Sequence, residues 1–274
     1  GGTHRKSFRR IITYTRLIIT PGRHADRPCF ISFSNRGGWK WVLHLHLAGG
    51  RLICDEHLPN LYDRRGATMI DRIQWLGHAS FRIQGPPLIY INPWHVARNA
   101  FHADAILITS DQYDHCSPGD IDKLRGPNTV IVASPLAAVT LGDHAKVLRP
   151  WQSLNIGLAR VTAVPAYTFT HHHPVSKGEL GFVISLDYYD IYYAGSTDVI
   201  PELEHVQADV AILPVAAGQG TMSLEQAVSL VKRMRPSWVI GSHWGTFGGT
   251  HLDVQAMARE IDGQSKVVML EKMR

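Results

Sequence analysis

From Met69 onward, short apolar runs alternate with single helix signals, and this alternation constrains the fold more than any other feature of the chain. Turn-forming residues bound most runs, as expected for β-strands. Many short strands with helices appearing singly between them predict a mixed α/β domain. The predicted strands are Ile73–Leu76, Ser80–Ile83, Leu88–Asn92, Ala105–Ile108, Thr129–Ala133, Lys146–Arg149, Arg160–Val164, Gly181–Leu186, Ile191–Ala194, Val210–Leu213, Trp238–Ser242 and Lys266–Leu270.

Three predicted helices have readable boundaries. Two begin after a serine N-cap, one with proline at its first position and the other with glutamine at the capping-box position. The third ends at a glycine. The helices follow Ser117, span Leu224–Met234, and run from about Leu252 to Ile261.

The composition changes near Met69. Residues 1–68 hold 12 Lys and Arg against 4 Asp and Glu, whereas residues 69–274 hold 16 against 19. The net charge of +5 is therefore a property of the N-terminal segment. We predict a basic extension over residues 1–68, either of uncertain order or containing an added hairpin made from Trp39–Leu47 and Gly50–Cys54, and a separate domain over residues 69–274.

Several classes of protein are disfavoured by the sequence. No apolar run reaches the roughly 18 residues of a membrane span, and the basic N-terminus lacks the apolar core of a secretory signal. The three cysteines, Cys29, Cys54 and Cys116, are too widely spaced to suggest a disulfide framework or a thiolate zinc site. The basic segment has no repeated Arg/aromatic pattern. We expect a cytoplasmic protein that acts on a small molecule, not on nucleic acid or a membrane.

The loop within Ile106–Pro118 (ILITSDQYDHCSP) places Asp114 beside His115 directly after an apolar run. Carboxylates and imidazoles are the usual protein ligands of divalent cations such as zinc. Further motifs lie at or near the ends of predicted strands. They are Trp75–Phe81 (WLGHASF), Ile91–Trp94 (INPW), Pro165–Tyr167, His173–Pro174, Tyr193–Asp198 (YAGSTD) and Ser242–Thr246 (SHWGT).

In order and spacing, these motifs resemble the metallo-β-lactamase superfamily from about residue 70 to the end, in particular the subgroup that includes L-ascorbate-6-phosphate lactonase-like proteins. The resemblance implies an α/β fold with a four-layer αββα sandwich over residues 69–274. It also implies two divalent cations that activate a shared water and stabilise the oxyanion formed when that water attacks a carbonyl or phosphoryl centre.

The chain departs from the family's loop, which reads His-x-His-x-Asp-His. Two histidines and the bridging aspartate are replaced by residues that are weak, neutral ligands. We therefore predict at most one divalent cation, zinc or manganese, with none as the alternative. The matching ligand positions are Asp114, His115, His173 and His243, and the replaced ones are Ser110, Gln112 and Ser196.

Asp114 and His115 are also the predicted catalytic residues, although hydrogen bonding within their own loop is an open alternative. Asn92 departs from the aspartate usual in the subgroup. His78 is predicted to be a structural histidine in a strand turn. Residues predicted to support the site or line its pocket are Asn92, Asp111, Asp198, Trp94 and Trp244.

Three functions remain open at this stage. The first is a metal-dependent hydrolase of a lactone, ester or phosphoester, with an impaired metal site. The second is an inactive member of the family that serves as a binding or regulatory scaffold. The third is metal-free catalysis with Ser110 or Ser196 as nucleophile and a histidine as general base. We favour the first function, a metal-dependent hydrolase. The family resemblance is also compatible with a homo-oligomer.

Overall fold

The structure, a computed structural model, describes residues 29–34, 40–48, 51–54, 68–98, 100–215, 220–261 and 263–273. The chain divides into two units, Gly1–Arg65 and Gly66–Arg274. In the first unit, β1 (Cys29–Ser34), β2 (Lys40–Ala48) and β3 (Arg51–Cys54) form an antiparallel sheet in that order. The pairing of β2 with β3 is the hairpin that the sequence offered as an alternative.

The first sheet of the second unit has six strands in the order β4-β5-β6-β7-β8-β9. The strands from β4 to β6 pair antiparallel, and those from β6 to β9 pair parallel. Their bounds are β4 Ile73–Gly77, β5 Ser80–Ile83, β6 Ile89–Ile91, β7 Ala105–Ile108, β8 Val130–Ala133 and β9 Ala145–Val147.

The second sheet has seven strands in the order β10-β11-β12-β13-β14-β15-β16. It repeats the same plan, because its early strands pair antiparallel and those from β13 to β16 pair parallel. The bounds are β10 Ser153–Ile156, β11 Ala159–Pro165, β12 Leu180–Leu186, β13 Tyr189–Tyr193, β14 Val210–Pro214, β15 Trp238–Ser242 and β16 Lys266–Val268.

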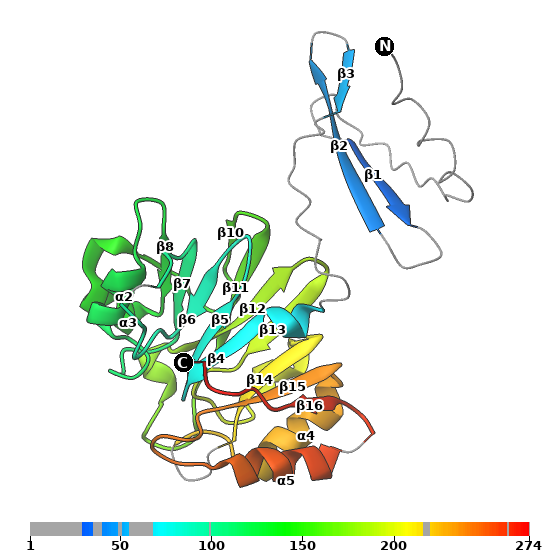
Figure 1. Ribbon diagram of the computed structural model, residues 1–274. Coiled ribbons are helices and arrows are strands. Elements are labelled where there is room, and N and C mark those ends of the chain that lie inside the picture. Colours follow the sequence, from blue (N-terminus) through cyan, green and yellow to red (C-terminus); the bar gives the residue numbers. More distant parts are fainter. Residues whose placement is uncertain are drawn as a thin grey trace. The chain divides into compact units, whose positions relative to one another are not determined.

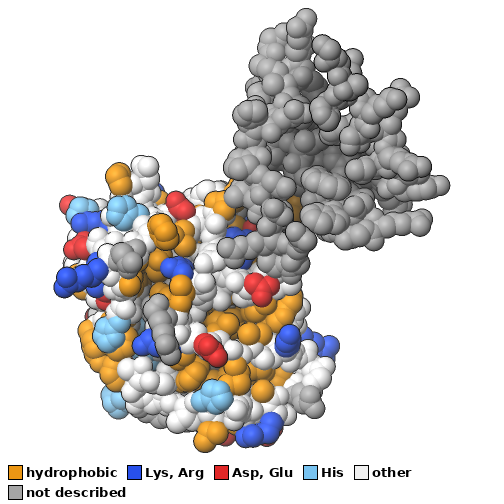
Figure 2. Space-filling view, viewed as in Figure 1, with side chains coloured by type: hydrophobic (Ala, Val, Ile, Leu, Met, Phe, Trp, Pro, Cys, Tyr) orange, Lys and Arg blue, Asp and Glu red, His pale blue; other side chains and the backbone are white. Residues whose placement is uncertain are grey.

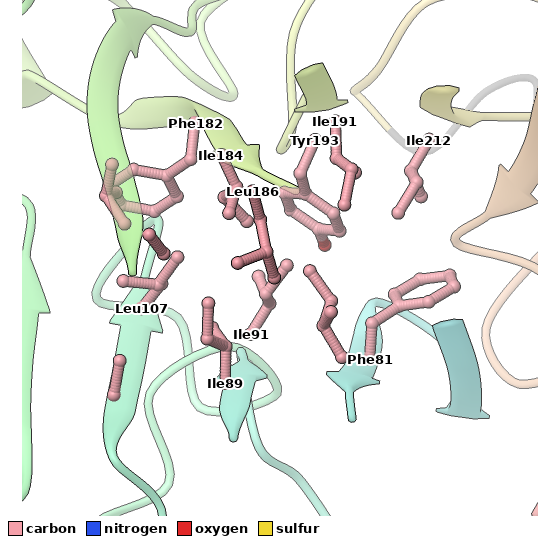
Figure 3. Close-up of a cluster of buried hydrophobic side chains, with 14 of the residues drawn as sticks. Phe81, Ile89, Ile91, Leu107, Phe182, Ile184, Leu186, Ile191, Tyr193 and Ile212 are labelled. Atoms are coloured by element: carbon pink, nitrogen blue, oxygen red, sulfur yellow. The ribbon is translucent and has the colours of Figure 1, made fainter. Parts of the chain in front are cut away.

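The two sheets pack face to face over a shared hydrophobic core (Figure 3). Strand periodicity sends alternate side chains to opposite faces. Ile89 and Ile91 of β6 belong to the central core, whereas Tyr90 between them packs in the cluster with α2 (Pro118–Leu124) and α3 (Pro135–Leu141). In the same way Tyr192 of β13 belongs to the cluster with α4 (Leu224–Met234) and α5 (His251–Ile261). The layer order is helix, sheet, sheet, helix (Figure 1), and the predicted αββα sandwich is confirmed.

The longer helices begin close to their predicted positions. α2 (Pro118–Leu124) follows Ser117, and α4 (Leu224–Met234) has the predicted capping box between Ser223 and Gln226. α5 (His251–Ile261) begins one residue earlier than expected. Helix α3 (Pro135–Leu141) was not predicted. The short elements are α1 Met69–Arg72, η1 Gly142–His144, η2 Val175–Lys177 and η3 Pro201–His205.

Charged side chains of both signs lie among hydrophobic ones on the coloured part of the face in Figure 2. This mixture agrees with the near balance of charges counted over residues 69–274. Within the described parts of the chain, no helix is long and apolar enough to cross a membrane.

Candidate metal centre

Three histidines of the second unit lie just beyond strand ends. His78 follows β4, His115 lies in the loop after β7, and His243 follows β15. The His243 backbone N–H donates to the His78 carbonyl oxygen at 3.0 Å, and His78 also forms an isolated bridge with Trp244. These backbone contacts join the two sheets and bring residues from both ends of the domain together.

Left-handed backbone conformations mark the same place. His78, Asn92 and His243 have φ angles of 51°, 45° and 62°. Such angles cost a residue with a side chain roughly 1 kcal/mol or more. Asn92 is held by two partners: its Oδ1 accepts from the Thr109 N–H at 3.0 Å, and its Nδ2 donates to the Tyr193 hydroxyl at 3.2 Å. Asn92 therefore ties the first sheet to the second beside the histidines.

His78, His115 and His243, here called the histidine trio, form a compact buried group. One nitrogen of each ring lies within 4.8 Å of those of the other two. The three side chains belong to residues that are 5%, 1% and 4% exposed. His115 Nε2 and His243 Nε2 are 3.2 Å apart. Buried polar rings in such proximity need either hydrogen-bond partners or a shared ligand.

In His115 and His243, the ring nitrogen that does not face the other histidine, Nδ1, contacts a serine hydroxyl. Ser110 Oγ lies 3.0 Å from His115 Nδ1, and Ser242 Oγ lies 2.9 Å from His243 Nδ1. Ser196 Oγ is 3.3 Å from His243 Nε2. If each Nδ1–H donates to its serine, both Nε2 atoms present lone pairs to each other. That arrangement is what two ligands of one cation require.

Burial keeps these imidazoles neutral. It lowers the pKa of His115 to about 4, even though the nearby Asp114 charge opposes the shift. Burial and the neighbouring His115 ring also hold the pKa of His243 well below its usual value. Neutral imidazole is the form that binds a metal, so both rings are ready to ligate at neutral pH.

Asp114 contacts the third ring. The Asp114 Oδ2 atom lies 2.9 Å from His78 Nε2, and the Asp114 Oδ1 atom lies 3.9 Å from His115 Nδ1. Burial alone would raise the pKa of Asp114, but the hydrogen bond with His78 and the nearby His115 lower it. With Nε2 engaged, His78 Nδ1 is buried and has no hydrogen-bond partner among the described residues. A carboxylate on one ring nitrogen and a vacant lone pair on the other is the usual arrangement of a metal-bound histidine.

The geometry of the histidine trio fits a divalent cation. Two nitrogens that bind zinc at about 2.0–2.1 Å with tetrahedral angles lie roughly 3.3 Å apart. The two Nε2 atoms are 3.2 Å apart, and His78 supplies a third buried nitrogen within the same group. Three imidazole nitrogens with an adjacent carboxylate form a donor set suited to zinc.

His173, the remaining predicted ligand, has a different partner. Its Nδ1 lies 2.7 Å from Glu179 Oε2, and both residues are 3% exposed. The other carboxylate oxygen, Oε1, is buried without a hydrogen bond among the described residues, and Lys177 Nζ approaches it at 3.9 Å. His173 is not a member of the histidine trio. Of the four predicted ligands, the structure thus brings His115 and His243 into one group, with Asp114 attached through His78.

Four further residues were predicted either as a replaced ligand, Gln112, or as support for the site, Asp111, Asp198 and Trp244. Gln112 is half-buried, and Asp111 is exposed in the same loop. Asp198 Oδ2 accepts from the Phe169 N–H at 2.8 Å and so fixes the loop that leads to His173. Trp244 stacks on Trp75 with ring centroids 4.1 Å apart.

Sequence reasoning assigned no ligand role to His78 and did not single out Glu179. The signal for His78 was its place at a strand end after Gly77, whose φ of 121° allows the chain to turn there. Its neighbours in the sequence gave no carboxylate partner, since Asp114 lies 36 residues away.

Comparisons with known proteins agree with this architecture. Residues 72–243 match the beta-lactamase superfamily domain. Over 220 residues the chain is 30% identical to a UPF0173 metal-dependent hydrolase of Pyrococcus abyssi, and the alignment covers 73% of this chain and 96% of the relative.

Two solved structures are similar in fold. One is a protein from Parabacteroides distasonis ATCC 8503, with a TM-score of 0.65 at 22% identity. The match covers 89% of this chain and 99% of the chain from that organism. The other is Igni18, a metallo hydrolase from Ignicoccus hospitalis, with a TM-score of 0.62 at 21% identity over 74% of this chain and 95% of its own.

Proposed function

We propose that this chain, which belongs to the beta-lactamase superfamily, is a metal-dependent hydrolase with a single divalent cation. The observation that carries the proposal is the histidine trio, whose buried nitrogens lie within 4.8 Å of one another, with 3.2 Å between the Nε2 atoms of His115 and His243. The relatives described as metal-dependent hydrolases support the same reading.

A bound cation would supply a water that ionises near neutral pH and a Lewis acid for the substrate's carbonyl or phosphoryl oxygen. The chain's own residues would prepare the ligands. Asp114 fixes the ring of His78 through Nε2, while Ser110 and Ser242 fix the tautomers of His115 and His243. We propose zinc as the cation, because all three proposed ligands are imidazoles.

The replaced positions support one cation in place of two. Ser110 and Ser196, which stand where the family has ligands, hydrogen-bond to members of the histidine trio. His173 lies outside the histidine trio. A second cation would therefore lack a comparable group of strong ligands. We propose a small carbonyl or phosphoryl ester or a lactone as the substrate.

Metal content tests the proposal directly. The full chain, purified without a polyhistidine tag, is exposed to zinc, freed of excess and measured by inductively coupled plasma mass spectrometry. We expect about one equivalent per chain, and metal-dependent turnover on a panel of esters, lactones and phosphoesters. His243→Ala should lose both, whereas His205→Ala, which changes an exposed histidine in η3, should retain both. A wild-type chain that binds no metal would contradict the proposal and favour a scaffold role.

A further inference from the structure

Three aromatic rings from separate loops form a cluster beside the histidine trio. Trp94 follows β6, Tyr113 lies in the loop after β7, and Phe247 follows β15. Ring centroids are 5.6 Å apart for Trp94 and Phe247, 6.0 Å for Tyr113 and Phe247, and 6.2 Å for Trp94 and Tyr113. We call these three residues the aromatic wall.

The aromatic wall begins at the proposed metal centre. The ring of His78 meets Phe247 edge-on at 5.0 Å and Trp94 at 6.0 Å. An apolar group attached to a substrate at the histidine trio would therefore have aromatic surface within reach. Such placement of a few polar groups beside apolar and aromatic side chains is typical of small-molecule sites.

Exposure distinguishes the aromatic wall from a closed core cluster. Tyr113 is 66% exposed and Phe247 is 44% exposed, although both rings contact other aromatic rings. Exposed aromatic surface next to a buried polar centre gains free energy when a ligand covers it. Flat rings also prefer other rings, in stacked or edge-to-face contact.

We infer that the substrate carries an aromatic group, and that this group packs on Tyr113 and Phe247. The inference rests on the proposed hydrolase function and narrows its substrate class. The residues of the aromatic wall would determine specificity, because they bind the part of the substrate that does not react.

Two esters with the same leaving group test the inference on the zinc-loaded full chain. Ethyl 3-phenylpropionate should be hydrolysed with a kcat/KM about tenfold above that of ethyl butyrate, since one apolar group in contact is worth that order of discrimination. The double variant Tyr113→Leu, Phe247→Leu should remove the preference mainly through KM. Tyr188→Leu, which changes a tyrosine that is 94% exposed in the turn between β12 and β13, is the control and should retain it. Equal rates for the two esters would overturn the inference.

A binding measurement separates this inference from the hydrolase proposal. In saturation-transfer NMR with metal-free protein, the phenyl protons of 3-phenylpropanamide should receive magnetisation from the wild-type chain and lose it in the double variant. If no compound of the ester, lactone and phosphoester panel is hydrolysed, the hydrolase proposal fails and this experiment alone decides whether the aromatic wall binds an aryl group. Equal transfer in the wild type and the double variant would refute that binding role.

Discussion

Asp114→Asn should weaken metal binding without removing the site. The Asp114 carboxylate lies 2.9 Å from His78 Nε2, and its side chain is only 11% exposed. Asparagine has the same shape and keeps an acceptor oxygen, but it removes the charge. A hydrogen bond to a charged group is worth about 1.5–3 kcal/mol, and a neutral one about 0.5–1.5 kcal/mol. The difference of roughly 1.4 kcal/mol corresponds to an approximately tenfold increase in the zinc Kd, within the range for residues that orient metal ligands.

The assay is a competition titration of apo-protein with zinc and a chromophoric chelator at neutral pH. Asp111→Asn is the matched control, because it removes an exposed carboxylate from the same loop. Circular dichroism and the thermal midpoint of each variant establish that it is folded. Equal zinc Kd values for Asp114→Asn and the wild type would refute the role of Asp114 in orienting His78. Loss of the whole metal equivalent would show instead that Asp114 is itself a ligand.

Four further outcomes are expected. Ser196→Ala should change turnover less than about tenfold, since the hydroxyl makes a 3.3 Å contact with His243 Nε2; a larger loss with serine labelling by a phosphonate would indicate a nucleophile. Asp120→Asn should destabilise the fold by about 1–3 kcal/mol at pH 7 in urea unfolding. Burial would raise the pKa of Asp120, but hydrogen bonds from Lys123 and from the His95 N–H lower it. The stabilisation by the Asp120 carboxylate is therefore present above its unfolded-state pKa of about 3.9 and is lost as the pH falls through its folded-state pKa. An unchanged loss of unfolding free energy in Asp120→Asn at pH 2 would contradict this. Burial and the Asp111 charge raise the pKa of Cys116 to about 11, so in a Cys29→Ser, Cys54→Ser background iodoacetamide at pH 8 should alkylate the chain only after unfolding. Zinc at 100 times its Kd should stabilise the wild type by about 2.7 kcal/mol, or roughly 5 to 10 °C in thermal midpoint, and should leave His243→Ala unchanged.

Most of the strand framework was predictable because its residues are buried on both faces. Ala105–Ile108 and Val210–Pro214 are buried throughout, and buried strands read as apolar runs in a sequence. β10 was missed because Ser153–Ile156 is an edge strand that mixes exposed and buried residues. α3 was missed although Ser134 accepts from the Ala137 N–H and Pro135 is at the first position. Its signal resembled the one recognised after Ser117.

The metal centre was less predictable because it depends on contacts between distant segments. The motif search identified Asp114, His115 and His243, but it could not show that the turn after β4 brings His78 to them. That proximity arises from the backbone contact between His78 and His243, which lie just beyond β4 of the first sheet and β15 of the second. The aromatic wall has the same origin, since Phe247 meets Trp94 and Tyr113 only in the fold.

The backbone and the buried nitrogens together argue that the histidine trio is a binding site and not a structural cluster. Two of its members have left-handed φ angles, each at a cost of roughly 1 kcal/mol or more. A buried nitrogen without a partner, such as His78 Nδ1, costs about a further 1–3 kcal/mol. Apolar residues at these positions would avoid the cost of the buried nitrogen. A cation bound between the three rings would give one nitrogen of His78 and the two facing Nε2 atoms a shared partner, so metal binding gives one physical reason for the proximity of these buried rings.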